Sequence, residues 1–246
     1  MIEIINLSKE FGRHPVLRGV NLEVREGETL VIIGRSGCGK SVLLKHIIGL
    51  MRPDEGQVIV DNEEVSRADE MALRRIRLKF GMLFQGAALF DSLTVGENVA
   101  FPLREHTGLD EPAVQERIRE CLGYVGLAGI EHLKPAELSG GMRKRVGLAR
   151  ALAIKPRVIL YDEPTTGVDP IGADAINRLI KGLHDRFQVT GVVVTHDMVS
   201  AYKVADRIAM LHEGRILQQG TVEEIRSTSN PIVKQFILGI SENGGG

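Results

Sequence analysis

The chain has 246 residues, 43% of them hydrophobic, which is enough to bury one large α/β domain or a core with one inserted subdomain. Its 31 Lys and Arg residues nearly balance its 32 Asp and Glu residues, and the net charge of −1 gives no electrostatic reason to expect a nucleic-acid ligand. Two cysteines, Cys38 and Cys121, cannot form a disulfide framework and suit a reduced, cytoplasmic setting.

The chain starts without the basic region and long apolar core of a secretory signal, and no apolar stretch approaches the ~20 residues that span a bilayer. We therefore expect an unexported, soluble chain whose membrane role comes through a partner.

The N-terminal part of the chain predicts an antiparallel sheet. Short apolar pieces alternate with glycine turns. The pieces are Ile2–Ile5, Val20–Val24 and Gln57–Asp61, and the turn residues are Gly12, Gly19 and Gly27.

A glycine-rich turn follows the apolar run Leu30–Ile33 and opens a helix predicted for Lys40–Leu50. Residues 34–41 read Gly-Arg-Ser-Gly-Cys-Gly-Lys-Ser. The glycines let backbone N–H groups converge on an anion, the helix directs its positive dipole end there, and Lys40 adds a mobile positive charge. The pattern predicts a phosphate cradle that contains Cys38; the alternative is a glycine turn that happens to carry a lysine.

Residues 86–155 predict a helical subdomain inserted between the early and late strands of a parallel core. The strand Phe80–Phe84 delivers Gln85 at its end. From Pro112 to Leu127 the apolar positions recur at steps of three and four, with Asp110 placed to cap the helix and Gly126 to stop it. Cys121 falls on the apolar face of this helix, where packing is the expected role.

A second helix of this region begins after Ser139-Gly140-Gly141 and is ended by Pro156. Ser139 can cap the helix, and the two glycines allow a phosphate to approach its backbone N–H groups. One face of the helix is apolar and basic residues surround that face. The apolar set is Met142, Val146, Ala149 and Leu152, and the basic set is Arg143, Lys144, Arg145 and Arg150.

Continuous apolar strands at Val158–Tyr161 and Val192–Val194 deliver polar residues to the edge that holds the phosphate loop. Asp162 can hold Mg²⁺ beside the Ser41 hydroxyl, which leaves Glu163 to polarise the water that attacks a γ-phosphate. His196 and Gln85 follow two other strands and can reach the same water or metal. In isolation these residues also fit a strand end, a structural histidine and a surface glutamine.

The end of the chain predicts a closing hairpin at Ile208–Gln219, turning at Glu213-Gly214, and a disordered tail at 241–246. We therefore expect a single domain over 1–246. Residues 1–85 and 156–240 would form the nucleotide-binding core with its antiparallel β subdomain, and 86–155 the helical subdomain.

These motifs, in this order, make the chain resemble the ATPase subunits of ATP-binding-cassette (ABC) transporters from residue 2 to about residue 240. The resemblance implies a RecA-like P-loop NTPase fold, α/β in class, and ATP and Mg²⁺ as cofactors. It also implies a head-to-tail homodimer in which each ATP lies between one phosphate loop and the partner's Ser139–Gly141. Asp169 would lie at the dimer seam, Phe11 would stack on adenine and Val16 would pad it.

The resemblance assigns catalytic roles to Glu163, His196 and Gln85, and metal ligation to Ser41, Gln85 and Asp162. The residues implied to contact ATP are Phe11, Val16, Gly34, Arg35, Ser36, Gly37, Cys38, Gly39, Lys40, Ser41, Val42, Ser139, Gly140, Gly141 and Asp169.

Three residues depart from the family pattern. Met142 stands where the signature usually has glutamine and removes a polar amide. Phe11 replaces the common tyrosine, so stacking survives without a hydroxyl contact. Val168 replaces the more usual leucine, a small packing change.

A finer resemblance links the chain to the ATPases of the bacterial system that maintains outer-membrane lipid asymmetry. It is carried by residues 83–90, residues 98–107 and the signature Leu138–Arg143 with its methionine. It implies a subunit that energises phospholipid transport through a separate integral membrane permease, which residues just after Gln85 contact. A lipid-binding substrate protein and a small regulatory subunit are further partners it allows, at the cytoplasmic face of the bacterial inner membrane.

Three other functions stay open at this point. An importer ATPase for a small polar solute would carry the same motifs. A soluble nucleotide-gated clamp on nucleic acid or ribosomes fits less well, because the charge is near neutral and the chain has a single cassette. A small-molecule kinase would use the phosphate loop but leaves Ser139–Gly141 without a role.

Overall fold

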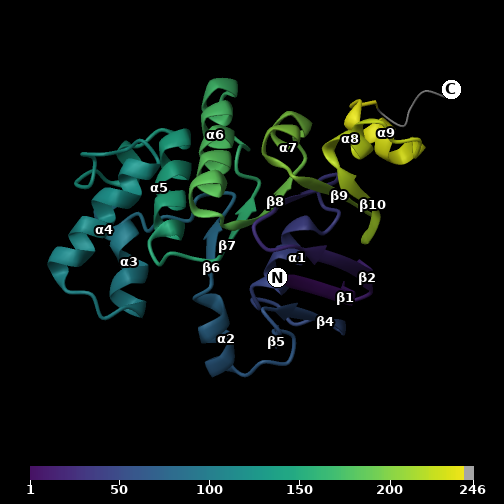
Figure 1. Ribbon diagram of the computed structural model, residues 1–246, viewed down its shortest axis with the longest axis horizontal. Helices are drawn as coiled ribbons and strands as arrows, with labels where there is room; N and C mark the ends of the chain where they lie inside the picture. Colours follow the sequence, from purple (N-terminus) through teal and green to yellow (C-terminus); the bar gives the residue numbers. More distant parts are fainter. Residues whose placement is uncertain (241–246) are drawn as a thin grey trace.

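The computed structural model describes residues 1–240 and contains two sheets (Figure 1). The four-stranded sheet has the order β2 (His14–Val24), β1 (Ile2–Phe11), β4 (Glu55–Val60) and β5 (Glu63–Glu64). The six-stranded sheet has the order β10 (Arg215–Thr221), β9 (Arg207–His212), β3 (Thr29–Ile33), β8 (Thr190–Thr195), β7 (Val158–Asp162) and β6 (Phe80–Leu83).

The helices pack around these sheets. They are α1 (Lys40–Ile47), α2 (Glu70–Arg77), α3 (Val95–His106), α4 (Glu111–Tyr124), α5 (Gly140–Leu152), α6 (Pro170–Phe187), α7 (Met198–Val204), α8 (Val222–Arg226) and α9 (Pro231–Ile237), with a 3₁₀ turn η1 at Pro135–Glu137. In the part of the chain that the structure describes, no helix has the length and hydropathy to cross a membrane.

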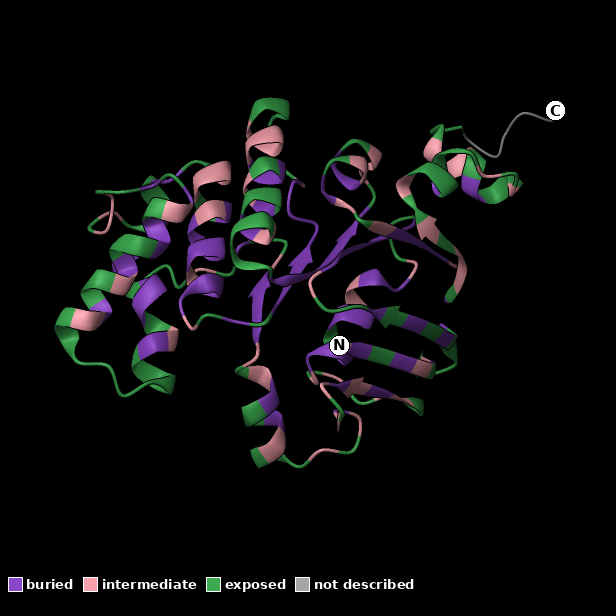
Figure 2. Cartoon of the chain, viewed as in Figure 1, coloured by how far each residue is buried: buried purple, intermediate pink, exposed green. Residues whose placement is uncertain are grey.

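The six-stranded sheet is parallel from β9 to β6, and both its faces are covered. Side chains of β3 alternate between two apolar clusters, with Val31 and Ile33 facing α3–α7 and Leu30 and Ile32 facing α1 and the four-stranded sheet. All five residues of β3 are therefore buried, as Figure 2 shows for the central strands. The expected α/β core with a parallel sheet is confirmed.

The predicted hairpin at the end of the core is present. Strands β9 and β10 pair antiparallel, and β9 also pairs parallel with β3, so the hairpin closes one edge of the main sheet. Its turn residues Glu213 and Gly214 both have positive φ, 46° and 76°, which is the geometry of a tight two-residue hairpin turn.

The predicted antiparallel sheet is also present, but one of its expected turns is wrong. Gly12 turns the chain between β1 and β2, whereas Gly19 lies inside β2. The register of the pair shifts between Ile4 and Leu7, where Asn6 has φ 50°, and again between Leu7 and Lys9, where Gly19 has φ 68°. Gly19 therefore supports a β-bulge, because a bulge needs the same backbone freedom as a turn.

The region 86–155 is helical, and α3, α4 and α5 lie beside one another at one end of the molecule (Figure 1). The Asp110 carboxylate accepts a hydrogen bond from Ala113 N and caps α4, while Gly126 at φ 68° follows its end, as predicted. Cys121 is fully buried in the apolar cluster of this layer. Its predicted packing role is confirmed.

Some helix ends and whole helices differ from expectation. Helix α1 ends at Ile47 instead of Leu50, since Gly49 takes a left-handed conformation (φ 69°). Helix α5 ends at Leu152, before Lys155 (φ 53°) and Pro156. Helices α2, α6, α7, α8 and α9 have no counterpart among the predicted elements. The predicted disordered tail, 241–246, lies outside the described residues.

Candidate functional site

The glycine-rich loop joins β3 to α1 and is closed by its own lysine. Lys40 is buried and its Nζ donates to the carbonyl oxygens of Gly34 (2.8 Å) and Arg35 (3.1 Å). Gly39, which caps α1, has φ 106°, and a Cβ there would lie about 3.0–3.1 Å from atoms of Leu17 and Val16. A side chain at this position would be strained and would crowd Val16 and Leu17, so the backbone here favours glycine.

The acidic pair at the end of β7 lies next to the loop, as predicted. The Ser41 hydroxyl donates to Oδ1 of Asp162 at 2.8 Å, and the Asp162 residue is 8% exposed. An alcohol and a carboxylate oxygen at this distance are the donor types that Mg²⁺ prefers. The donor set therefore fits a magnesium ion that keeps water and phosphate oxygens as its other ligands.

Glu163 places its carboxylate between three groups. Its Oε1 lies 3.5 Å from Lys40 Nζ, and its Oε2 lies 2.9 Å from His196 Nδ1 and 3.2 Å from the donating Thr166 hydroxyl. The backbone of Glu163 is left-handed (φ 47°), an uncommon conformation for a residue with a side chain. Such a conformation at the end of a buried strand is typical of functional sites.

These groups line one cavity of about 320 Å³. Gln85 and His196 lie in its wall with the phosphate loop and Glu163, so the four sequence signals meet at one sheet edge as predicted. The lining residues are Val16, Ser36, Gly37, Gly39, Lys40, Ser41, Val42, Gln85, Glu163 and His196.

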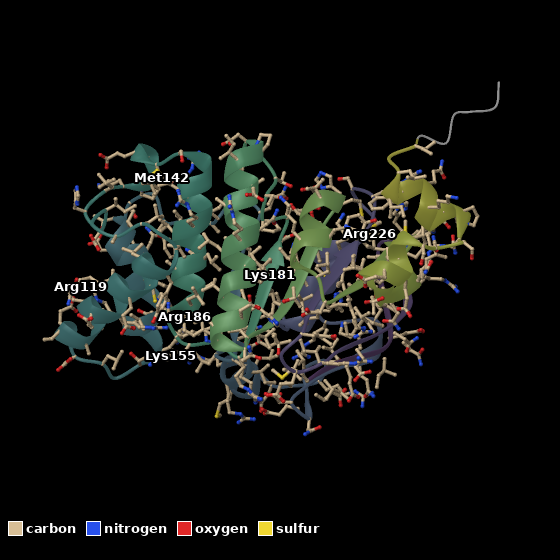
Figure 3. The ribbon with its side chains drawn as sticks, turned by 45° about the horizontal axis from the view of Figure 1, so that its top comes forward. Arg119, Met142, Lys155, Lys181, Arg186 and Arg226 are labelled. Carbon is tan, nitrogen blue, oxygen red and sulfur yellow. The ribbon has the colours of Figure 1, made fainter. Side chains whose placement is uncertain are left out.

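The remaining predicted phosphate contacts line a second cavity, of about 370 Å³. Ser139, Gly140 and Gly141 lie there with Asp169. Ser139 Oγ accepts from Met142 N (3.2 Å) and caps α5, while Asp169 Oδ1 accepts from Ile171 N (3.1 Å) and Gly172 N (3.0 Å) and caps α6. In Figure 3, Met142 lies at one end of the helical layer and Lys155 and Arg186 at the other. The N-terminal ends of α5 and α6 thus form a separate surface.

Of four further predicted nucleotide ligands, Val16 lines the first cavity, and Phe11, Arg35 and Cys38 are not among its lining residues. Val16 also contacts the loop at Gly39, while Phe11 at the end of β1 is 48% exposed, with Lys9 Nζ 5.8 Å from its ring centre. Arg35 and Cys38 belong to the loop, whose Arg35 carbonyl also accepts from Cys38 N at 3.3 Å. Burial raises the pKa of the Cys38 thiol. The adenine contacts of Phe11 and Val16 stay predictions.

Two buried polar residues near the site have no counterpart in the sequence analysis as site residues. Lys144, expected among the basic residues around α5, is only 5% exposed, and its ammonium group donates to the carbonyl oxygens of Gln85 and Glu163. Asn98 on α3 is fully buried and holds the loop that follows Gln85. Gly147 and Ala151 are small residues on the same face of α5 as Lys144. They are the sequence signal that another backbone segment packs closely against this face.

Comparison with known proteins places this geometry in context. A sequence model of the family described as "ABC transporter" matches residues 17–166. The chain is 42% identical, over 97% of its length, to the probable ribonucleotide transport ATP-binding protein mkl of Mycobacterium bovis, and it spans 66% of that protein's length. It is 39% identical to the intermembrane phospholipid transport system ATP-binding protein MlaF of Haemophilus influenzae, over 98% of this chain and 92% of that one.

A solved structure has the same fold. The ATP-binding cassette MJ0796, determined as a dimer in a post-hydrolysis state with ADP and Pi, superposes with a TM-score of 0.84 at 36% identity. The match covers 90% of this chain and 99% of that one. The similarity therefore extends over most of the chain.

Proposed function

The chain belongs to the ABC transporter family, and we propose that it binds and hydrolyses ATP as the subunit that energises phospholipid transport through a separate membrane permease. The observation that carries the proposal is the Glu163 carboxylate, which lies 3.5 Å from Lys40 of the phosphate loop and 2.9 Å from His196. A carboxylate in this place can take a proton from water beside a bound phosphate.

Each side chain at the loop has a distinct role in this proposal. The Lys40 ammonium neutralises charge that develops on the phosphoryl oxygens, and the α1 N-terminus adds its dipole. Glu163 accepts a proton from the attacking water, and His196 fixes the carboxylate through Oε2 and hydrogen-bonds the phosphoryl group. No covalent intermediate with the chain is needed, because phosphoryl transfer to water requires positioning and charge stabilisation.

Mg²⁺ is the proposed metal cofactor, held by Ser41, Asp162 and Gln85. Among the described residues there is no cluster of three or more His, Cys, Asp or Glu side chains that would cage an ion. A site with one carboxylate and one hydroxyl suits Mg²⁺, which takes its other oxygen ligands from water and from substrate phosphates. When bound, the ion would neutralise phosphate charge.

Two copies of the chain are proposed to share each ATP. Ser139–Gly141 and Asp169 line a cavity other than the one at the phosphate loop. This separation supports the proposal that they contact a nucleotide bound by the phosphate loop of a second copy. Ser139 caps the N-terminus of α5, whose first N–H groups suit an anionic group presented by a second copy. The dimeric state of the MJ0796 cassette supports the same arrangement.

A groove beside Gln85 is the proposed docking site of the permease. It has a volume of about 910 Å³ and lies between the end of β6, α2 and α3. Phe90 and Phe101 are 45% and 41% exposed in its wall, with ring centroids 4.8 Å apart, and Arg74, Arg77 and Glu105 add charge at its rim. An amphipathic cytoplasmic segment of a permease would match this groove. Such docking would hold the chain peripherally at the cytoplasmic face of a bacterial inner membrane.

The phospholipid substrate is proposed from similarity to MlaF, whose name states phospholipid transport and of which this chain covers 92%. The mkl protein, named for ribonucleotide transport, favours the alternative of a polar solute. The deciding experiment purifies the tagged chain with its membrane partners in mild detergent, and measures phosphate release with phospholipid or with ribonucleotide added. Phospholipid that copurifies and stimulates phosphate release supports the proposal, and ribonucleotide-stimulated release would replace it with the alternative.

A further inference from the structure

One ammonium group contacts the backbones of two residues at the site. Lys144 Nζ donates to the carbonyl oxygen of Gln85 (2.5 Å) and to the carbonyl oxygen of Glu163 (3.0 Å). The side chain comes from α5 and is 5% exposed. A buried cation needs partners of this kind, since an unpaired charge away from water is costly. Burial lowers the pKa of Lys144.

The carbonyl of Glu163 belongs to a backbone that needs support. Glu163 has φ 47°, a conformation that costs free energy for any residue with a Cβ. Its N–H donates to Val194 O at 3.0 Å, and its carbonyl accepts from Thr166 N at 3.3 Å besides Lys144. The ammonium supplies the charged and shorter of the two donors to this carbonyl. It therefore fixes the peptide from which the carboxylate projects.

The Gln85 side of the contact is also strained. Ala87 and Ala88, which follow Gln85, have φ values of 62° and 48°. A second cation of α5, Arg150, donates to Ala87 O at 2.8 Å and to Ala88 O at 2.6 Å. Between the two cations lies Gly147, where a Cβ would be 3.2 Å from Ala87 O. One face of α5 thus holds segment 85–88 through Lys144 and Arg150. Of these two side chains, Lys144 also donates to the carbonyl oxygen of Glu163.

We propose that Lys144 is a positioning residue that sets the separation of Glu163 and Gln85 and fixes both to α5. Ser139 caps the same helix, so Lys144 links the surface proposed to face a partner copy with the groups proposed to act on the chain's own nucleotide. The inference rests on the proposed ATPase function for its catalytic consequence. Its structural content, the immobilisation of two backbone segments, holds independently of that function.

The first measurement is amide hydrogen exchange on the nucleotide-free chain. In Lys144→Met we expect faster exchange in peptides that contain residues 85–88 and 163–166, with strand β9 unchanged as the remote reference. In Arg150→Met only the 85–88 peptide is expected to change, because the Arg150 guanidinium donates to Ala87 and Ala88 within that segment. Arg143→Met, an exposed neighbour on the same helix, is the matched control and is expected to leave both peptides unchanged.

The second measurement separates catalysis from binding. In Lys144→Met we expect kcat for ATP hydrolysis to fall about tenfold or more, while the dissociation constant of a fluorescent ATP analogue changes less than about threefold. Lys144→Arg, which keeps a buried cation with several donors, is expected to recover most of kcat. A purely structural loss would lower binding and hydrolysis together.

The outcomes are distinct. Unchanged exchange at 85–88 and 163–166 in Lys144→Met overturns the inference, and so does an unchanged kcat in a protein whose wild type hydrolyses ATP. If the wild type releases no phosphate, the proposed function is refuted. The hydrogen-exchange measurement then tests the positioning role of Lys144 by itself. If Lys144→Met does not fold, Lys144→Gln is measured in its place, with the same two expectations.

Discussion

His196 Nδ1 lies 2.9 Å from Oε2 of Glu163, at the ends of the neighbouring strands β8 and β7. The other carboxylate oxygen faces Lys40 at 3.5 Å. The carboxylate is thus held from two sides by side chains of the chain itself, and its left-handed backbone lies at the end of a strand beside the phosphate loop. A group held in a fixed orientation loses less freedom when it reaches a reactive geometry.

The first prediction concerns this carboxylate. Glu163→Gln keeps the size of the side chain and a hydrogen-bond partner for His196, but it removes the carboxylate that is proposed to act as the base. We expect phosphate release to fall by about a hundredfold or more, while ATP stays bound between two copies. Size-exclusion chromatography with Mg-ATP should therefore show a dimer that the wild type forms only transiently.

Glu137→Gln, an exposed acidic residue on η1, is the control for a loss of one negative charge and should hydrolyse ATP at the wild-type rate. A Glu163→Gln protein that hydrolyses at normal speed would remove Glu163 from the role of base. One that remains monomeric with saturating Mg-ATP, even beside its permease, would contradict the shared-nucleotide arrangement.

A thiol in the phosphate loop gives the second prediction. Burial raises the pKa of the Cys38 thiol, so the reactive thiolate is scarce at neutral pH and grows more abundant as pH rises toward that raised pKa. We expect a maleimide to react slowly at pH 7 and faster at pH 9, to block nucleotide binding, and to be slowed by ATP. Mass spectrometry of the labelled peptide gives the rates.

Cys121 is the internal control, because burial raises its pKa to about 11 and its side chain is enclosed in the helical layer. It should react only after unfolding. If ATP does not slow the labelling of Cys38, the nucleotide binds elsewhere. As a second control, Cys38→Ser should still bind ATP, and the reagent should not block that binding.

Local sequence signals predicted the parts of the fold that depend on neighbouring residues. The apolar run before Gly34, the Asp110 cap and the Glu213-Gly214 turn each specify a backbone geometry within a few residues. The parallel pairing of β3, β7 and β8 followed from their continuous apolar character. Because the carboxyl ends of such strands share one edge, the meeting of Lys40, Glu163 and His196 could also be predicted.

Features that depend on tertiary contacts could not be predicted in the same way. Lys144 looks like a solvated residue on a basic helix, and only the tertiary approach of Gln85 and Glu163 gives its charge two carbonyl partners. Gly19 carries the same conformational signal whether it turns a chain or bulges a strand. Helix α6 does carry local signals that would have predicted it, namely the Asp169 cap, Pro170 at its first position and Ile176, Ile180 and Leu183 at helical spacing.

The third prediction is a pH dependence of stability. Hydrogen bonds from Lys79 and Arg75 lower the pKa of Glu63 from its ordinary 4.5 to about 2. A lowered folded-state pKa means that the carboxylate stabilises the fold above about pH 4.5, and that this contribution is lost as the pH falls toward 2. Wild type should therefore be more stable than Glu63→Gln at pH 7, and the difference should shrink between pH 4.5 and 2.

Urea unfolding of both proteins across this range measures the difference. Salt at high concentration should reduce it at pH 7, because the three side chains are solvent-accessible. A difference that grows as the pH falls would mean that the folded state raises the pKa of Glu63 instead of lowering it.

The last prediction concerns the loop at the proposed permease groove. Asn98 is fully buried on α3; its Oδ1 accepts from Phe90 N (2.8 Å), and its Nδ2 donates to the carbonyl oxygens of Thr94 (2.9 Å), Phe90 (3.1 Å) and Leu93 (3.3 Å). One amide thus fixes the loop that presents Phe90 to the groove. Asn98→Ala removes the side-chain partner of Phe90 N and one donor from each of these carbonyl oxygens, of which Thr94 O and Phe90 O keep a backbone donor, and it should lower the free energy of unfolding by about 2 kcal/mol.

The same substitution should weaken capture by the permease more than it alters nucleotide binding, because Phe90 loses its fixed position while the phosphate loop is untouched. Asn98→Asp keeps the acceptor for Phe90 N but places a buried carboxyl against three carbonyl oxygens, so it should weaken both folding and capture at least as much as Asn98→Ala. Detergent-solubilised permease on a resin, with each variant titrated over it, measures the affinity. Equal affinity for all three proteins, at temperatures where all are folded, would place the permease contact away from this loop.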